Sequence, residues 1–328
     1  MPSNPDFLLS TDPEEPPERL AGAVVAIGNF DGVHRGHRAV IARAKALARR
    51  LARPCAILTF EPHPVDFFGR GDAVFRLTSR DAKAHRIAEL GLDGMFVLTF
   101  DKALANLDAG EFLREILVRR LGVAAVVVGY DFHFGARRTG TPEFLREAAP
   151  KLGIAVEIVE KVVADEEGSL EAVSSTATRE ALERGDVRGA AVLLGHLWSL
   201  TGTVIHGAKL GRQLGFPTAN LAVEDSCRLR HAIYAVEVDL DGRRLKGVAS
   251  FGRRPTVANE GPTLLEVYLF DFSEDLYGRD IEVFFIDFLR PETKFESLDA
   301  LIAQIRQDET LARRILDASQ FHRSPRSG

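Results

Sequence analysis

The pattern of apolar residues changes near residue 195, and this change restricts the folds that the chain can adopt. Before that point, short apolar runs alternate with stretches of helical periodicity. Because a strand buried on both faces reads as a continuous apolar run, the alternation predicts an α/β fold with a parallel sheet covered by helices. The predicted strands are Ala23 to Ile27, Cys55 to Phe60, Met95 to Phe100, Ala124 to Tyr130 and Ile154 to Val162.

After residue 195, strand follows strand. Tyr234 to Leu240 alternates apolar and polar residues, and Asp241-Gly242 is a two-residue hairpin signal. Two later runs, Leu264 to Phe270 and Ile281 to Phe288, add strands, so we predict a small antiparallel β-barrel. The last helix should bury one face, made of Leu298, Leu301, Ile302 and Ile305. The expected parts are a flexible leader (1–20), a first domain (21–185), a second domain (186–320) and a tail (321–328).

A ten-residue segment joins the first predicted strand to the first predicted helix. It reads Gly28, Asn29, Phe30, Asp31, Gly32, Val33, His34, Arg35, Gly36 and His37. A strand-to-helix corner of a parallel sheet offers free backbone N–H groups and the positive end of a helix dipole, and glycines let an anion approach closely. Histidines three apart lie near each other if the first helical turn has begun, and both could donate hydrogen bonds to a phosphorus centre that gains charge.

Two other interpretations of the histidine pair compete with phosphate binding. It could be half of a zinc site, but no further histidine or acid stands beside it at metal spacing, and Cys55 and Cys227 are the chain's two cysteines. It could also belong to an ordinary turn. Ten consecutive specified residues at such a corner favour phosphate binding instead.

The segment resembles the phosphate-binding signature of nucleotidyltransferases with a Rossmann-like domain, and is most similar to that of bacterial bifunctional riboflavin kinase/FAD synthetases. Later motifs agree: Thr59 to Pro64, Val128 to Gly135 and Ser174 to Arg179. The second domain also matches, so the resemblance covers roughly residues 20 to 318. It implies two reactions: phosphorylation of riboflavin to FMN by ATP, then adenylylation of FMN by ATP to give FAD and pyrophosphate.

The resemblance assigns the adenylyltransferase site to the first domain. His34 and His37 would act at the phosphates. The ATP contacts would come from Gly28, Asn29, Phe30, Asp31, Gly32, Gly36, Ser174, Ser175, Thr176 and Arg179. The flavin would lie against Pro62 and Pro64, which make a rigid apolar rim, and against Asp131 and Phe134. Without the resemblance, Thr59 to Pro64 could be a plain loop stiffened by proline, Gly129 to Gly135 a core aromatic cluster, and Ser174 to Arg179 a helix cap.

The resemblance assigns riboflavin kinase activity to the second domain. Its ATP site would include Gly207, Lys209, Gly211, Gly215 and Pro217. Thr218 and Asn220 would hold Mg²⁺ through hard oxygen ligands. Glu266 would be the base that accepts the hydroxyl proton, and its place on a face with Tyr268 and Phe270 favours a functional acid over a surface one. Arg254, Asp275 and Arg290 lie in matching segments and receive no role.

Composition narrows the choice of partners. The net charge of −5 gives no sign of the basic field that nucleic-acid binding requires, no run approaches the roughly eighteen apolar residues of a membrane helix, and the leader lacks a signal-peptide core. We expect a cytoplasmic protein whose partners are riboflavin, FMN and ATP, with weak or transient self-association left open. The alternatives are a nucleotidyltransferase for another substrate and a non-catalytic flavin-binding regulator.

Overall fold

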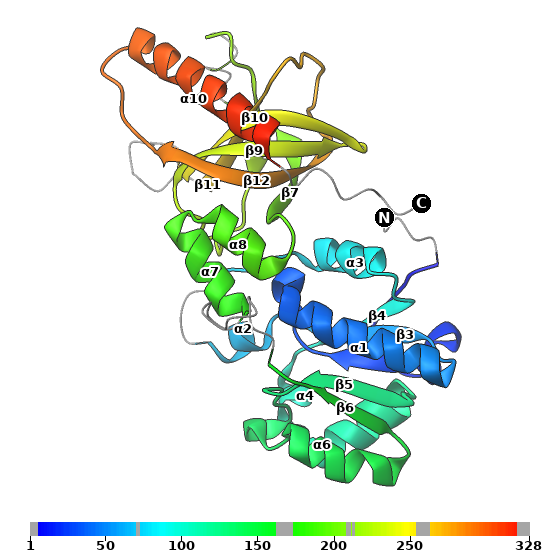
Figure 1. Ribbon diagram of the computed structural model, residues 1–328. Coiled ribbons are helices and arrows are strands. Elements are labelled where there is room, and N and C mark those ends of the chain that lie inside the picture. Colours follow the sequence, from blue (N-terminus) through cyan, green and yellow to red (C-terminus); the bar gives the residue numbers. More distant parts are fainter. Residues whose placement is uncertain are drawn as a thin grey trace. The chain divides into compact units, whose positions relative to one another are not determined.

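The computed structural model describes residues 6–69, 73–161, 173–207, 211, 214–253 and 263–319. The chain divides into two compact units, residues 1–175 and 176–328, each described here by itself (Figure 1). The predicted boundary at 185/186 lies ten residues later and stays a prediction about which segments fold independently. Within the described residues, no helix is both long and apolar enough to cross a membrane.

The first unit is built around a parallel sheet of six strands, which confirms the predicted parallel sheet and adds one strand to the five that were predicted. The strands are β1 (Leu8–Thr11), β2 (Val24–Ile27), β3 (Cys55–Glu61), β4 (Gly94–Thr99), β5 (Ala125–Gly129) and β6 (Ala155–Val159). The helices are α1 (Arg35–Leu51), α2 (Pro64–Phe68), α3 (Arg80–Glu89), α4 (Lys102–Asn106), α5 (Ala109–Glu111), a π-helical run (Phe112–Arg120) and α6 (Pro142–Ala148), with 3₁₀ turns at Glu18–Leu20, Asp31–Val33, Ala136–Arg138 and Ala149–Leu152.

Both faces of this sheet are buried, which explains the continuous apolar runs. Val24 and Ala26 of β2 pack with α1 and α3, whereas Val25 and Ile27 pack with the π-helical run and α6. The strand order β1-β4-β3-β2-β5-β6 makes the chain reverse direction beside β2. Ligands of open α/β sheets bind outside the carboxyl ends of the strands at such a reversal, so the loops after β2 and β5 occupy the expected position.

The N-terminal segment differs from the prediction. Leu8 to Thr11, inside the segment expected to be a flexible leader, form β1 and pair in parallel with the edge of β4. Four residues are too few to show periodicity, and their pairing partner lies some eighty residues away in the sequence, so local pattern did not reveal the strand.

The second unit contains the predicted closed antiparallel barrel, with strand order β10-β11-β8-β7-β12-β9. Its strands are β7 (Ser199–Ile205), β8 (Thr218–Ala222), β9 (Ala232–Leu240), β10 (Arg243–Arg253), β11 (Thr263–Leu269) and β12 (Asp280–Pro291); its helices are α7 (Ser175–Arg184), α8 (Val187–Leu194) and α10 (Leu298–Ala318). The predicted hairpin joins β9 to β10, with positive φ at Asp241 (51°) and Gly242 (81°), as a type I′ turn requires.

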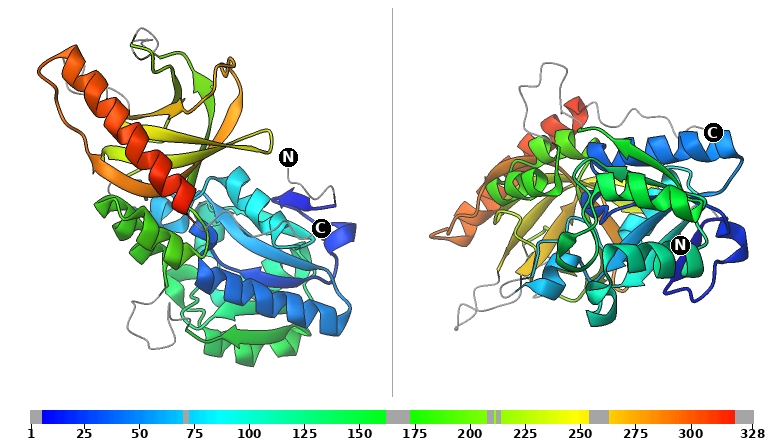
Figure 2. Two further views of the ribbon diagram at one scale, coloured as in Figure 1. Left: turned by 45° about the horizontal axis from the view of Figure 1, so that its top comes forward. Right: turned by 90° about the horizontal axis from the view of Figure 1, so that it is seen from below.

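Helix α10 lies along the outside of the barrel (Figure 2). Its fully buried apolar contacts are Ala312 and Leu316, which lie toward the end of the helix, whereas Leu298, expected on the buried face, is exposed. Arg290, which had no predicted role, forms a bidentate ion pair with buried Asp308, from Nε to Oδ1 at 2.9 Å and from Nη2 to Oδ2 at 2.8 Å. This pair fixes the helix to β12.

Candidate active sites

The corner after β2 has an unusual backbone that a phosphate-binding loop could use. Phe30, Gly32 and Val33 all have positive φ, at 49°, 80° and 43°. Phe30 and Val33 are non-glycine residues in a sparsely populated conformation, which persists because both side chains are buried in the core. The chain then enters α1, and His34 is its N-cap: Nδ1 accepts a hydrogen bond from the His37 backbone N–H at 3.2 Å.

The two histidines lie together, as the spacing predicts. Their rings stack with centroids 3.6 Å apart, and Phe30 packs against His37 with centroids 5.1 Å apart. Gly36 leaves room for the His34 ring, because a Cβ there would come within 3.2 Å of it. Burial, followed by the neighbouring His34 and Lys83, holds the pKa of His37 well below its ordinary value. The buried Nδ1 atom of His37 has no hydrogen-bond partner among the described residues, so a polar atom at the corner is left for a ligand.

The side chain of Asp31 stabilises this corner through hydrogen bonds. Its buried carboxylate accepts hydrogen bonds from the backbone N–H groups of Leu77 and Thr78, at 3.0 and 3.1 Å. The Thr78 hydroxyl in turn accepts from the N–H of Gly32 at 3.1 Å. The Asp31 side chain was expected at ATP, but these contacts give it a structural task in the corner.

The motif Ser174 to Arg179 falls at the junction of the two units. The Ser175 hydroxyl donates to the Asp31 carbonyl oxygen at 2.9 Å, which ties the start of α7 to the corner. Thr176 and Arg179 belong to α7 within the second unit. The expected contact of Arg179 with phosphate therefore stays a prediction.

The end of β3 carries a group of paired charges that sequence reasoning missed, in which Lys83 is buried and its charged partners are half-buried. Lys83 of α3 donates from Nζ to Thr59 Oγ1 and to Glu61 Oε1, both at 3.2 Å. Arg76 binds the other oxygen of Glu61 and lies 3.4 Å from Asp66. Despite the burial of Glu61, the cations Lys83 and Arg76 hold the pKa of its carboxyl below the ordinary value. The signal in the sequence was a lysine on the apolar face of a helix.

The two prolines expected to form the flavin rim come directly after the end of β3. Pro62 is exposed and Pro64 half-buried, as first residue of α2, a position that suits proline. Beyond them stands an aromatic group that sequence reasoning also missed: Phe67 and Phe68 each pack edge-on against Phe100, with centroids 5.4 and 5.6 Å apart. Phe68 is 63% exposed. Two adjacent phenylalanines after the proline pair were the available signal.

The loop after β5 separates the two residues that were expected together. Asp131 is exposed, so its carboxylate is accessible to a ligand. Phe134 is only 7% exposed and packs in the core against Phe112 and Phe144. A Cβ at Gly140 would lie 2.5 Å from the Phe134 ring, so the glycine makes room for it. Direct contact of Phe134 with flavin is therefore not supported: the pattern of aromatics did not show which ring turns inward.

In the barrel, Glu266 and Asn220 are brought face to face. They are direct partners in the antiparallel ladder between β11 and β8, and Tyr268 is opposite Thr218. Residues paired in this way project to the same side of the sheet with Cβ atoms about 5 Å apart. The expected base and both expected metal ligands thus share one face of two neighbouring strands.

Glycines shape the loop between β7 and β8. A Cβ at Gly211 would lie 2.4 Å from the Phe216 carbonyl oxygen, and Gly215 has φ of +87°, so neither position suits another residue. Gly207 lies directly against the Asn220 side chain. Lys209 lies outside the described residues, as does Arg254.

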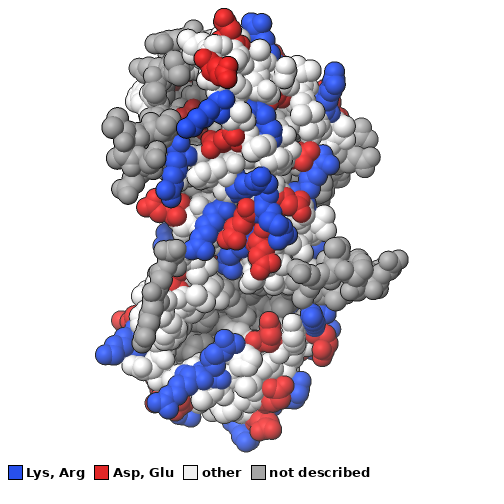
Figure 3. Space-filling view, turned by 90° about the vertical axis from the view of Figure 1, so that its left-hand side faces the viewer, with Lys and Arg blue, Asp and Glu red and all other residues white. Residues whose placement is uncertain are grey.

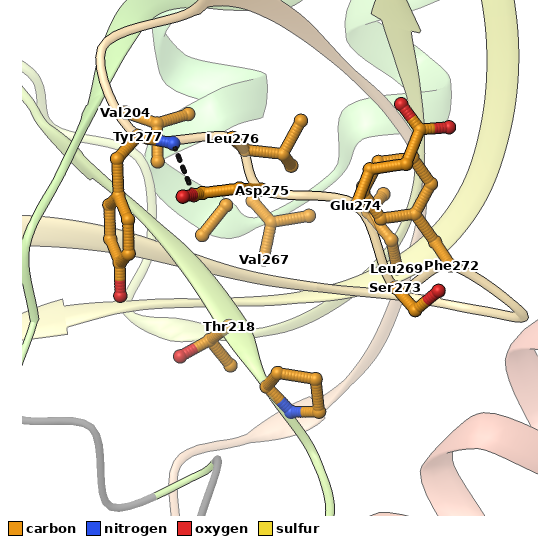
Figure 4. A pocket seen from close by; sticks show the side chains of 12 residues that line it. Val204, Thr218, Val267, Leu269, Phe272, Ser273, Glu274, Asp275, Leu276 and Tyr277 are labelled. Carbon is orange, nitrogen blue, oxygen red and sulfur yellow. Dashed lines mark hydrogen bonds between the residues drawn. The ribbon is translucent and has the colours of Figure 1, made fainter.

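A cavity of about 340 Å³ lies beside the start of strand β8 (Figure 4). Its lining includes Thr218, Val267, Leu269 and Tyr277, and Asp275, whose carboxylate accepts from the Tyr277 N–H at 3.1 Å. Val267 and Leu269 alternate with Glu266 and Tyr268 along β11, so these two lining residues project from the face opposite to Glu266, whereas Thr218 belongs to the face of Glu266. The cavity has the size and the mostly apolar walls of a small-molecule site.

The donors present fit magnesium better than zinc. Among the described residues, no group of three or more His, Cys, Asp and Glu side chains could hold a metal ion. The hydroxyl of Thr218 and the amide oxygen of Asn220 are hard, neutral ligands of the type that Mg²⁺ uses together with phosphates and water. The space that Gly207 leaves for Asn220 supports a fixed position for that amide.

Figure 3 shows one face of the molecule, on which acidic and basic side chains are interleaved. This agrees with the balanced composition of 42 basic and 47 acidic residues. On the described part of this face, the charges do not favour one sign.

Comparisons with known proteins cover both units. The family profile for FAD synthetase matches residues 17–177, and the profile for riboflavin kinase matches residues 194–316. A "Bifunctional riboflavin kinase/FMN adenylyltransferase" from Pseudomonas fluorescens is 44% identical over 302 residues, which cover 92% of this chain and 95% of that protein. A protein of the same name from Escherichia coli K12 is 41% identical over 306 residues, which cover 93% of this chain and 94% of that protein.

A solved structure also matches along most of the chain. The crystal structure titled as a macrolide-efflux protein from Streptococcus pneumoniae has a TM-score of 0.81 and 30% identity, covering 94% of this chain and 99% of that one. From the two family profiles and these relatives along nearly the whole length, the chain belongs to the family of bifunctional riboflavin kinase/FMN adenylyltransferases.

Proposed function

We propose where this bifunctional riboflavin kinase and FMN adenylyltransferase carries out its two reactions. FMN is joined to ATP at the carboxyl edge of the parallel sheet, and riboflavin is phosphorylated at the paired strands β8 and β11. The observation that carries the proposal is the pairing of Glu266 with Asn220, because it brings a general base and a metal ligand together on one face.

In the adenylyltransferase reaction, a phosphate oxygen of FMN attacks the α-phosphorus of ATP, and pyrophosphate leaves. His34 and His37 donate hydrogen bonds to phosphate oxygens as charge develops there, and Arg179 binds the polyphosphate. The backbone of Gly28 to Gly32, the Gly36 N–H and the hydroxyls of Ser174, Ser175 and Thr176 complete the ATP site. The corner geometry supports this use, since a buried nitrogen of the His37 ring has no hydrogen-bond partner in the part of the chain that the structure describes.

The flavin of FMN lies against Pro62, Pro64 and the exposed ring of Phe68, and Asp131 accepts a hydrogen bond from its polar edge. Phe134 supports this loop from the core. The exposed aromatic group is the supporting observation, since a ring system could cover it and exclude water.

In the kinase reaction, Glu266 accepts the proton of the riboflavin 5′-hydroxyl, which attacks the γ-phosphorus of ATP. Thr218 and Asn220 would hold Mg²⁺, which would supply positive charge to neutralise the phosphates. The ATP base enters the cavity beside Tyr277, and Gly207, Lys209, Gly211, Gly215 and Pro217 form the loop around the phosphates. Thr218 both lines this cavity and lies on the face that carries Glu266, so the γ-phosphate of ATP meets riboflavin on that face.

Crossed variants test this assignment in the full chain. His37→Ala should lower FAD formation from FMN on the order of 10²-fold and keep riboflavin phosphorylation. Glu266→Gln should lower phosphorylation by roughly 10² to 10⁴-fold and keep FAD formation. The controls in the same units are His85→Ala, at a half-buried position of α3, and Glu224→Gln, at an exposed position. Chromatography of flavin products gives both rates, and equal loss of the two activities in either variant would contradict the assignment.

We further infer that Mg²⁺ is the divalent metal, that the protein is cytoplasmic, and that its partners are small molecules rather than nucleic acid or membrane. A different nucleotidyltransferase would make no FAD from FMN, and a flavin-binding regulator would turn over neither substrate. Product chromatography with riboflavin, ATP and Mg²⁺ separates all three alternatives.

A further inference from the structure

Lys83 occupies a position between the two halves of the proposed adenylyltransferase site. Its side chain comes from α3, and the residue is 4% exposed. Nζ donates to Thr59 Oγ1 and Glu61 Oε1, which lie on the same side of β3 near its carboxyl end. A lysine is almost never so deeply buried without a specific set of partners.

The bond to Thr59 leads to the phosphate-binding corner. The Thr59 hydroxyl donates its single proton to the Asn29 carbonyl oxygen at 3.0 Å. An ammonium group can only donate, so it bonds to a lone pair of Oγ1 and leaves the hydroxyl proton aimed at Asn29. Without Lys83, the Thr59 hydroxyl could rotate away, and the corner would lose a fixed contact.

The bond to Glu61 leads to the flavin rim. Glu61 directly precedes Pro62, and its two carboxylate oxygens are bound separately, one by Lys83 and the other by Arg76. Arg76 also lies close to Asp66 of α2, whose other oxygen accepts from the Val74 N–H at 2.7 Å. The rim is thus held to the same ammonium that orients Thr59.

From this geometry we propose that Lys83 is a positioning residue for adenylyl transfer, which sets the separation between the FMN phosphate and the α-phosphate of ATP. The proposal rests on the site assignment given under Proposed function. Lys83 contacts neither substrate. It acts through Thr59 and Glu61, and a displacement of about 1 Å between reacting groups can cost as much as 10²-fold in rate.

The proposal is tested in the full-length chain with Lys83→Met, which keeps the length of the side chain and removes its charge. We expect kcat for FAD formation from supplied FMN to fall by about 10 to 100-fold, with the KM values of FMN and ATP within about threefold. Riboflavin phosphorylation by the same protein should be unchanged. The matched control is Lys45→Met, a half-buried lysine of α1 whose Nζ binds the Leu90 carbonyl oxygen at the C-terminal end of α3.

Thr59→Val decides the question if the Lys83 variant does not fold. Valine has the shape of threonine, and the change leaves the Lys83–Glu61 pair intact. We expect a smaller loss in kcat, about 3 to 10-fold, and no additional loss when Thr59→Val is added to Lys83→Met, because both changes break one chain of contacts. A parental kcat in folded Thr59→Val, multiplicative losses in the double variant, or losses confined to KM would each overturn the proposal.

His37→Ala separates this proposal from the site assignment. If His37→Ala retains FAD formation, the site itself is misassigned. If His37→Ala loses FAD formation while Lys83→Met and Thr59→Val keep it, only the role of Lys83 is wrong.

Discussion

The amide of Asn220 lies against the α-carbon of Gly207: a Cβ built on this glycine would come within 2.5 Å of Nδ2 and 2.6 Å of Oδ1. Position 207 therefore requires glycine because a Cβ would not fit there, and not because its backbone has a positive φ. The amide that we propose as a metal ligand has its position only because residue 207 carries no side chain.

Gly207→Ala should abolish most kinase activity, because the methyl group would displace the Asn220 amide. We expect at least about a tenfold loss in riboflavin phosphorylation, with FAD formation from FMN retained, as measured by product chromatography. The control is Gly202→Ala in the preceding strand β7, where the new Cβ would meet the end of the Leu221 side chain at 3.2 Å. Parental kinase activity in Gly207→Ala would refute the proposed role of Asn220.

Asn220→Ala should weaken the kinase's use of metal. Removing one of two protein oxygen ligands should raise the Mg²⁺ concentration for half-maximal phosphorylation about tenfold or more. The measurement is a Mg²⁺ titration at saturating ATP and riboflavin. The Mg²⁺ dependence of FAD formation in the same protein is the internal control, and a shift in both dependences would speak against a local ligand.

His37 should make the stability of the folded protein depend on pH. The pKa of His37 in the folded chain lies well below its ordinary value of 6.5. At pH values between the folded and the unfolded pKa, the unfolded chain therefore binds one more proton than the folded chain. Stability then increases with pH, is complete above about 6.5, and falls by up to about 1.4 kcal/mol per pH unit as the pH drops below that value. Urea unfolding at pH 7.5, 6.5 and 5.5 should show a steeper loss for the parent than for His37→Asn, and identical slopes would argue that His37 is not buried as described.

Asp308→Asn should destabilise the barrel unit. Loss of one charge from a buried bidentate pair leaves Arg290 without its partner and should cost about 3 kcal/mol in unfolding free energy. Asp317→Asn on the same helix removes an exposed pair with Lys246, which water and salt screen, so its effect on unfolding should be much smaller. Denaturant unfolding of the two variants compares them directly, and equal costs would contradict the importance of burial.

Residues 176–328 should fold and act alone. This unit has its own barrel core and carries Thr218, Asn220 and Glu266. A fragment that starts at Thr176 should convert riboflavin to FMN and form no FAD, as followed by chromatography. A folded fragment without kinase activity would show that the first unit supplies part of the kinase site.

The sequence predicted the central strands closely because they carry a strong local signal. β3 was expected at Cys55 to Phe60 and forms from Cys55 to Glu61, and the Asp241-Gly242 turn is where the hairpin was expected. Strands buried on both faces and a turn with positive φ are encoded within a few residues.

What escaped prediction depends on contacts between distant segments. Lys83 lies on the apolar face of its helix, but its partners on β3 are known only once α3 is packed beside that strand, and the inward orientation of Phe134 depends on its contact with Gly140. The pairing of Glu266 with Asn220 required the register of two strands more than forty residues apart. Sequence reasoning supplied candidates for both sites, but not the network that holds them.

The short strand β1 covers a sheet edge that could otherwise pair with a strand of another copy of the chain. It pairs with the open edge of β4, whose residues Met95 to Leu98 are fully buried. At the opposite edge, β6 carries Glu157, bound by Arg43 and Arg50 of α1, a charged arrangement that discourages further pairing. Removal of residues 1–12 would leave the unpaired N–H and C=O groups of β4 as a template for another strand, so the part of the chain that looks most dispensable protects the sheet from aggregation.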